Sequence, residues 1–127
     1  DDPRVTELLN KALGYYRKAT DEWASVGERH HWVATQALSI SAVLKVPSDN
    51  STVSTFKLAR ELAERDLQRS AVPGQAWAHG TLAELDLLSL YHLPQPEAQA
   101  AARREEIKSS VVKHCREIVF TLDTVTV

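Results

Sequence analysis

Apolar residues recur in steps of three and four along most of this chain, and that spacing places them on one face of an α-helix. The first stretch carries such a stripe, formed by Val5, Leu8, Leu9, Ala12, Tyr16, Ala19, Trp23 and Val26. Prolines interrupt the pattern at Pro47, Pro73, Pro94 and Pro96. A proline ends a helix because it lacks an amide donor and crowds the preceding turn. We therefore expect an all-α fold with five helices, over residues 3–26, 29–46, 51–70, 74–92 and 96–122.

Local signals mark several helix ends. Asp2 before Pro3 is typical of a cap followed by the first helical residue, and the loop at residues 48–51 can supply a cap for the third helix. The fourth segment is apolar nearly all round, which indicates a helix packed between neighbours. Residues 121–127 are β-branched and alternating, so either a fraying helix end or an extended segment fits them. No other stretch has a strand pattern of adequate length.

The composition excludes several classes of protein. The chain has 127 residues, one cysteine and a formal charge of -2. One cysteine rules out an internal disulfide framework and a zinc site built from several cysteines, and the near-neutral charge argues against a nucleic-acid binder. No apolar run approaches the roughly 20 residues needed to span a membrane. The chain also lacks methionine and a signal-peptide pattern, so we expect a cytoplasmic domain excised from a longer protein.

Two segments of the chain are similar to each other. Residues 32–38 open the second predicted helix, residues 77–83 open the fourth, and both segments begin with tryptophan. A proline-containing break and a charged amphipathic helix follow each of them. This pattern predicts a helical hairpin that is repeated once, with the first helix packed on the front, because one hairpin cannot bury its own apolar face. We expect Trp32 and Trp77 in the core between helices, since an indole carries the largest burial energy in each repeat.

The second segment carries a longer motif, Trp77-x-x-Gly80-Thr81-Leu82-Ala83-Glu84-x-x-Leu87-Leu88, followed by Ala98 and Ala101. Similar upstream positions are His31, Trp32, Gln36, Ala37, Leu44, Ala59 and Ala63. Together they resemble the tetratricopeptide-like repeats of the TRAFs-binding-domain family. That family occurs in the central regulatory region of some stress-activated MAP kinase kinase kinases and in bacterial sensor proteins. The resemblance implies a five-helix right-handed α-α superhelix that binds a partner and passes the event to attached domains, without catalysis.

In such a stack the first helix of each hairpin lines the concave face, and its outward polar residues select the partner. By position relative to the two tryptophans, this binding surface comprises His30, Gln36, Ser41, Gln75, His79 and Asp86. We expect Asp86 on the open surface, and Glu84 as a structural residue paired with a basic side chain of the same domain. The expected partner is a protein or peptide, a neighbouring domain of the parent chain, or a second copy of the chain.

The sequence offers no convergent catalytic or metal-binding set, so we expect neither an enzyme nor a metal or cofactor site. His114 and Cys115 are adjacent and point about 100° apart on a helix, and Cys115 lies on an apolar stripe where a buried thiol is expected. The histidines are expected in caps or in helix packing. Glu84 and Asp86 lie on opposite faces of one helix, which argues against a catalytic carboxylate pair.

Two functions stay open at this point. The leading hypothesis is a non-catalytic helical-repeat module for protein–protein interaction, with a regulatory or scaffold role in a larger signalling protein. The alternative is a sensor domain that binds a small ligand or a nucleotide-derived signal and controls a linked effector. The sensor predicts a closed polar pocket between helices, with Gln36, His79 or Glu84 pointing inward, whereas the interaction module predicts an open groove.

Overall fold

The computed structural model describes residues 2–25, 31–69, 72–93 and 96–126 of the chain. These residues form five helices, α1 (Pro3–Ser25), α2 (His31–Val43), α3 (Asn50–Arg69), α4 (Val72–His92) and α5 (Glu97–Thr126). No strand is present among them, which confirms the prediction of an all-α fold with five helices. Each predicted helix corresponds to one observed helix, and the differences are confined to helix ends. None of the described helices is both long enough and apolar enough to cross a membrane.

Side-chain caps determine where α1 and α3 begin. Oδ1 of Asp2 accepts a hydrogen bond from the backbone amide of Arg4 at 2.9 Å, and Pro3 is the first helical residue. At α3, Oδ1 of Asp49 accepts from the amide of Thr52 at 2.9 Å, while the amide of Asp49 donates to Oγ1 of Thr52 at 3.2 Å. These bonds satisfy amides that have no partner inside the helix, and they lower the pKa of both aspartates. Both predicted caps are confirmed.

The second helix ends at Val43, before the predicted end at residue 46. Lys45 has a left-handed backbone conformation, with a φ of 57°. Its amide donates to the carbonyl of Ala42 at 3.1 Å, and the amide of Val46 donates to the carbonyl of Ser41 at 2.9 Å. This pair of bonds is the Schellman motif, which closes a helix and usually has glycine in the left-handed position. Because lysine occupies that position here, the local signal for this end of the helix is Pro47 alone, and it places the end three residues too late.

The other differences in helix ends lie in α4 and α5. α4 begins at Val72, so Pro73 lies within its first turn, where a missing amide donor is tolerated. α5 continues to Thr126, and the β-branched end of the chain is therefore helical up to that residue. The predicted start of the second helix at residue 29 lies outside the described residues.

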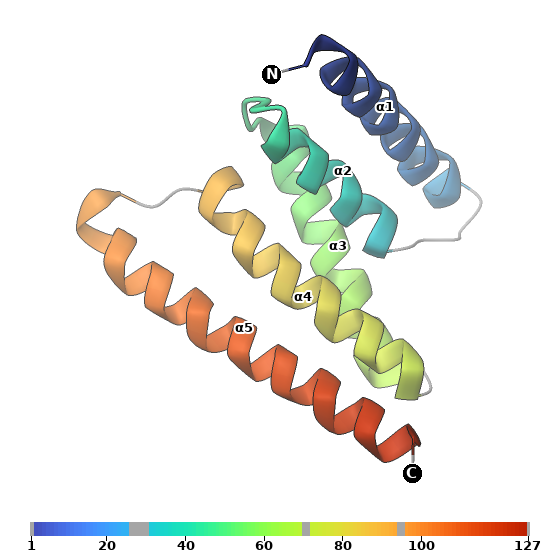
Figure 1. Ribbon diagram of the computed structural model, residues 1–127, viewed down its shortest axis with the longest axis vertical. Coiled ribbons are helices and arrows are strands. Elements are labelled where there is room, and N and C mark those ends of the chain that lie inside the picture. Colours follow the sequence, from blue (N-terminus) through green and yellow to red (C-terminus); the bar gives the residue numbers. More distant parts are fainter. Residues whose placement is uncertain (1, 26–30, 70–71, 94–95, 127) are drawn as a thin grey trace.

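The helices are stacked so that α2 and α4 lie in contact at the centre, with α3 packed against both (Figure 1). α1 packs on α2 at one end of the stack, and α5 packs on α4 at the other. Within the described ranges, α1 contacts only α2, and α5 contacts only α4. The apolar helix α4 therefore lies between neighbours, as predicted. The contact between α2 and α4 also brings the two tryptophan-containing segments side by side.

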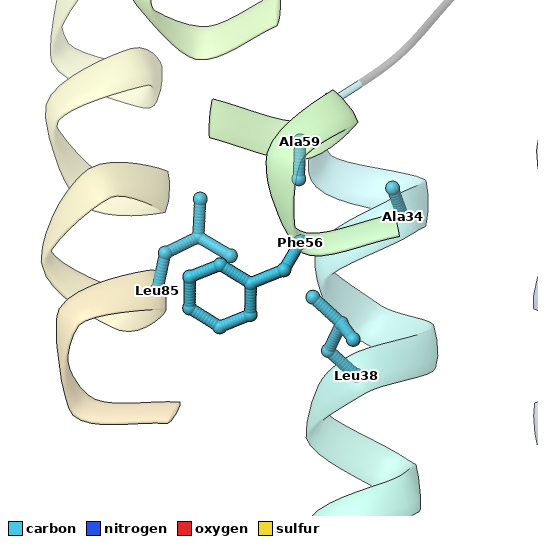
Figure 2. Packing of buried hydrophobic residues seen from close by; sticks show 5 residues of the cluster. All are labelled: Ala34, Leu38, Phe56, Ala59 and Leu85. Atoms are coloured by element: carbon cyan, nitrogen blue, oxygen red, sulfur yellow. The ribbon is translucent and has the colours of Figure 1, made fainter. Parts of the chain in front are cut away.

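The core is centred on the junction of α2, α3 and α4. The ring of Phe56 on α3 lies between Leu38 of α2 and Leu85 of α4, and Ala34 and Ala59 pack beside it (Figure 2). All five side chains are at most 4% exposed, and burying a phenylalanine side chain contributes about 1.5–3 kcal/mol. A second cluster, formed by Ala63, Ala78 and Leu82, joins α3 to α4. One phenylalanine ring, together with alanine and leucine side chains, therefore fills the contacts between these helices.

Candidate functional site

Both tryptophans that were expected in the core are exposed. Trp32 is 42% exposed and Trp77 is 64% exposed. The prediction that they anchor the hairpins is wrong, and the sequence-based argument for a recognition scaffold loses the premise on which it depended. The cause is local, because the buried residues Val33 and Ala78 directly follow the two tryptophans. Successive side chains on a helix point about 100° apart, so the smaller neighbour faces the adjacent helix and the indole faces away from it.

The two indoles instead line one open groove between α2, α4 and α5, which we name the indole groove. Its volume is about 400 Å³, and most of its surface is apolar. The lining residues are Trp32 from α2, Ala76, Trp77, Gly80, Thr81 and Glu84 from α4, and Ile118 from α5. The three residues assigned to structural roles from the sequence, Trp32, Trp77 and Glu84, therefore all line this groove.

Two further contacts shape the walls of the indole groove. The rings of Tyr16 and Trp32 meet edge to face, with centroids 5.9 Å apart and an interplanar angle of 82°, so α1 supports the Trp32 ring. On α4, Gly80 faces α5, and a methyl group placed on it would lie 4.0 Å from Cδ1 of Ile118. The space beside Ile118 can therefore hold one added methyl group, whereas a larger side chain at position 80 would extend into the groove.

Among the described residues that line the indole groove, Glu84 is the only charged one. It is half-buried, and its Oε1 accepts a hydrogen bond from the hydroxyl of Ser39 on α2 at 3.2 Å. Among the residues that the structure describes, no other hydrogen bond and no salt bridge involves this carboxylate. The prediction of a basic partner for Glu84 is wrong, because its partner within the described residues is the hydroxyl of Ser39. The groove therefore carries a negative charge that no ion pair neutralises within the described part of the chain.

Asp86 was expected on the open surface, and that prediction is wrong. The residue is 6% exposed. Its carboxylate accepts hydrogen bonds from Nη2 of Arg60 on α3, at 3.1 Å, and from the hydroxyl of Ser110 on α5. It is buried because α4 lies between α3 and α5, and each of these helices supplies a donor to it. Asp86 therefore links three helices and is unavailable to a partner protein.

The other residues of the predicted binding surface do not form a common site. Ser41 is buried and its hydroxyl donates to the carbonyl of Ala37 at 2.8 Å, so its assignment to an exposed surface is wrong. It lines a separate polar cavity of about 230 Å³ between α1, α2 and α3. Gln36 and Gln75 are half-buried, and neither lines the indole groove. His30 lies outside the described residues.

His79, also assigned to that surface, is half-buried and pairs with His114 of α5. Their Nδ1 atoms are 2.9 Å apart, so one Nδ1 donates a hydrogen bond and the other accepts it. Burial lowers the pKa of His114, and His79 lowers it further against the opposing effect of Asp86. Burial and His79 therefore favour the neutral form of the His114 ring in this contact between α4 and α5. No third histidine, cysteine, aspartate or glutamate in the described ranges completes a metal site with them.

Cys115 is exposed, so the expectation of a buried thiol is wrong. Its neighbour His114 faces α4, and the next position on the helix points about 100° away from it, toward solvent. Cys115 lies there on an apolar outer patch of α5 with Val111, Val112, Arg116, Val119 and Phe120. The apolar residues of α5 are thus divided between an inner face, which packs on α4, and this outer patch.

Two buried histidines join the helices of the stack. Nδ1 of His31 lies 2.6 Å from Oγ1 of Thr81 on α4, and its Nε2 lies 3.2 Å from Oδ2 of Asp66 on α3. At the C-terminal end of α4, Nε2 of His92 donates to the carbonyl of Leu38 on α2 at 2.8 Å. The predicted packing role of histidine is confirmed for these two residues. Nothing in the sequence distinguished them from the half-buried histidines His79 and His114, because their partners come from distant segments.

Comparison with known proteins finds no relative of this chain. No known protein family matches it, and neither a curated protein nor a solved structure is significantly similar to it. The resemblance to the TRAFs-binding-domain family therefore stays a prediction.

Proposed function

We propose that this domain is a non-catalytic helical module that binds a segment of another protein in the indole groove. The observation that carries the proposal is the presence of two exposed tryptophans, Trp32 and Trp77, in one mostly apolar groove. Tryptophan is enriched among the residues that supply most of the binding energy at protein interfaces, because it buries a large area with few rotatable bonds. Two indoles exposed side by side do not contribute the free energy of burying their apolar surface. A bound partner that covers them would gain that free energy.

The form of the groove favours a protein segment over a small ligand. A sensor site was expected to be closed and polar, with Gln36, His79 or Glu84 pointing inward. The indole groove is open and mostly apolar, and Glu84 is the only one of these three residues that lines it. Its volume of about 400 Å³ lies near the lower end of the range for ligand pockets. Such a groove suits one or two side chains that project from a partner protein.

We further propose that the module acts as a regulatory or scaffold part of a larger cytoplasmic signalling protein. The support is the resemblance to the TRAFs-binding-domain family, in which tetratricopeptide-like repeats form a right-handed α-α superhelix. The contact between α2 and α4 is the one such a superhelix would require between the first helices of neighbouring hairpins. A role in kinase regulation follows from the same resemblance.

The binding proposal is tested by selecting a random displayed peptide library on the domain. We expect enriched peptides that bind the unmodified domain and lose binding to Gly80→Leu, whose side chain fills the groove, and to Trp77→Ala. Tyr15→Ala is the matched control, because it removes an aromatic side chain that is 72% exposed on α1, away from the groove. Circular dichroism of each variant confirms that the helices are retained.

The proposal is contradicted if the library yields no binder, or if the selected peptides bind Gly80→Leu and Trp77→Ala as well as the unmodified domain. A small-molecule library screened by thermal shift covers the sensor alternative. A compound that stabilises the domain but not Gly80→Leu, together with failure of every peptide, would assign the groove to a small ligand instead.

A further inference from the structure

We propose that the indole groove receives an arginine side chain of the partner protein, with its guanidinium held between the indoles and the carboxylate of Glu84. This inference rests on the proposed function, and it names the chemistry that the groove recognises. Three observations carry it: the two exposed indoles, the half-buried carboxylate beside them, and the lack of a cationic side chain among the described residues that line the groove.

The aromatic surface attracts a cation in its own right. The face of an indole carries negative charge from its π-electrons, and tryptophan is the aromatic residue that holds cations best. Trp32 is supported by the edge-to-face contact with Tyr16, so its ring is positioned before a partner binds. Trp77 lies on α4, next to α2. Gly80 is three positions further along α4 and has no side chain that could cover the Trp77 ring. A flat cation entering the groove would thus meet aromatic surface from two helices.

The carboxylate of Glu84 supplies the charge that a cation needs. Its Oε1 is oriented by the hydroxyl of Ser39, whereas its Oε2 has no hydrogen-bond partner among the described residues. A half-buried carboxylate without an ion pair interacts more strongly with an incoming cation than one in open water, because less water screens it. Asp86, two positions further along α4, offers the contrast, since Arg60 already neutralises it within the domain.

Arginine fits these features better than lysine. Its guanidinium is planar, stacks on aromatic rings and presents several N–H donors at once, whereas a lysine ammonium is a compact and strongly hydrated charge. The aliphatic part of the arginine side chain can also lie along apolar walls such as Ile118 and Ala76 while the head reaches the carboxylate. The groove would therefore distinguish arginine from a neutral side chain of the same shape.

The test uses two short capped peptides, one with a single arginine flanked by leucines and one in which citrulline replaces the arginine. Citrulline has nearly the same shape and no charge. We expect the arginine peptide to shift the NMR signals of the Trp32 and Trp77 indole N–H groups, assigned with Trp32→Phe and Trp77→Phe. We expect the citrulline peptide to bind about ten-fold more weakly or worse, as is typical when a charged hydrogen bond is lost. Equal binding of the two peptides, or binding of neither, overturns the inference.

A second comparison locates the charge that is recognised. Glu84→Gln should lower the affinity for the arginine peptide to that of the citrulline peptide and leave the affinity for the citrulline peptide unchanged. Glu64→Gln, at an exposed position on α3, is the matched control and should change neither affinity. If Glu84→Gln binds the arginine peptide as well as the unmodified domain does, the proposed role of Glu84 is wrong.

The outcomes separate this inference from the proposed function. Library peptides that bind in the groove without arginine would support the interaction module and overturn the arginine inference. If no peptide binds in a way that depends on Trp77 and Gly80, both fail together.

Discussion

The two halves of α4 differ in what their side chains meet. In the first half, Trp77 lines an open groove, although it is the largest apolar side chain of the helix, and Glu84, just past the midpoint, lines the same groove. In the second half, Asp86 and His92 are at most 6% exposed, although both are polar. The difference arises from the neighbouring helices: the buried groups meet donors and acceptors from α2, α3 and α5, whereas the groove residues face a space that no described helix fills. On this helix, position relative to the neighbours decides burial more than residue type does.

The largest loss of stability is expected from a substitution in the second half of α4, at Leu85. Its side chain is fully buried against Phe56 and Leu38, so Leu85→Ala should lower the free energy of unfolding by about 3 kcal/mol through lost contacts and a cavity. Leu87→Ala removes the same atoms from a side chain that is 53% exposed on the same helix, and should cost under about 1 kcal/mol. Chemical denaturation measures both values. Equal costs would contradict the assignment of the core face of α4.

A smaller loss is expected when the buried carboxylate of Asp86 is removed. Asp86→Ala leaves Arg60 and Ser110 without their acceptor and should lower the free energy of unfolding by about 2 kcal/mol. Arg60 is partly exposed, so water can solvate its freed charge and limit the loss. Glu64→Ala, at an exposed position on α3, is the control and should change the stability little. A stability of Asp86→Ala within error of the unmodified domain would show that the link between the three helices contributes nothing.

In the first half of α4, replacing Trp77 with alanine should lower the free energy of unfolding only slightly. Truncation of a buried tryptophan to alanine costs roughly 3–5 kcal/mol. Because the side chain is 64% exposed, we now expect a loss under about 1 kcal/mol. Thermal and chemical denaturation of this variant, with Tyr15→Ala as the exposed aromatic control, check the value. A loss of about 3 kcal/mol or more, as for a buried tryptophan, would show that the Trp77 side chain is buried in the core.

The smallest effect concerns pH and the contact between His79 and His114. The pKa of His114 is lowered from 6.5, first by burial and then by His79, with Lys113 and Arg60 acting in the same direction and Asp86 opposing them. As the pH falls below about 6.5, the unfolded chain takes up a proton that the folded domain resists, so this contribution to stability is present above that pH and is lost below it. His114→Gln should therefore lose less stability than the unmodified domain between about pH 7.5 and pH 5.5.

Denaturation midpoints at the two pH values measure that difference. Lys108→Gln, on the exposed side of α5, is the control and should keep the pH dependence of the unmodified domain. Only the difference in pH dependence between the three proteins reports on His114. If His114→Gln loses as much stability between the two pH values as the unmodified domain does, His114 does not contribute to the pH dependence.

Much of the fold follows from local sequence signals. The periodic apolar residues and the prolines predicted five helices, and the caps at Asp2 and Asp49 depend only on residues within three positions of each other. The end of the second helix was placed three residues too late from Pro47, because a lysine, Lys45, adopts the left-handed conformation that usually takes glycine. Local signals therefore predicted the helices and most of their bounds.

The candidate site could not be predicted in the same way. The expectation for Trp32 and Trp77 used the burial energy of the residue type, but a helix rotation of about 100° between neighbouring positions decides whether the indole or the adjacent small residue faces the core. Asp86 and Glu84 were assigned in the reverse order, because the donors that bury Asp86 come from Arg60 and Ser110 on two other helices. Pairings between distant segments leave no mark in a single sequence.

The most direct test of the central claim is an NMR measurement of which residues surround the Cδ1 methyl group of Ile118. This methyl group lies on the α5 side of the indole groove, opposite Gly80 and the two indoles. The account predicts nuclear Overhauser contacts from it to the Gly80 α-protons and to the indole protons of Trp32 or Trp77, together with indole N–H signals that a soluble paramagnetic probe broadens. Indole signals protected from the probe, with the methyl group of Ile118 in contact with other residues, would contradict it.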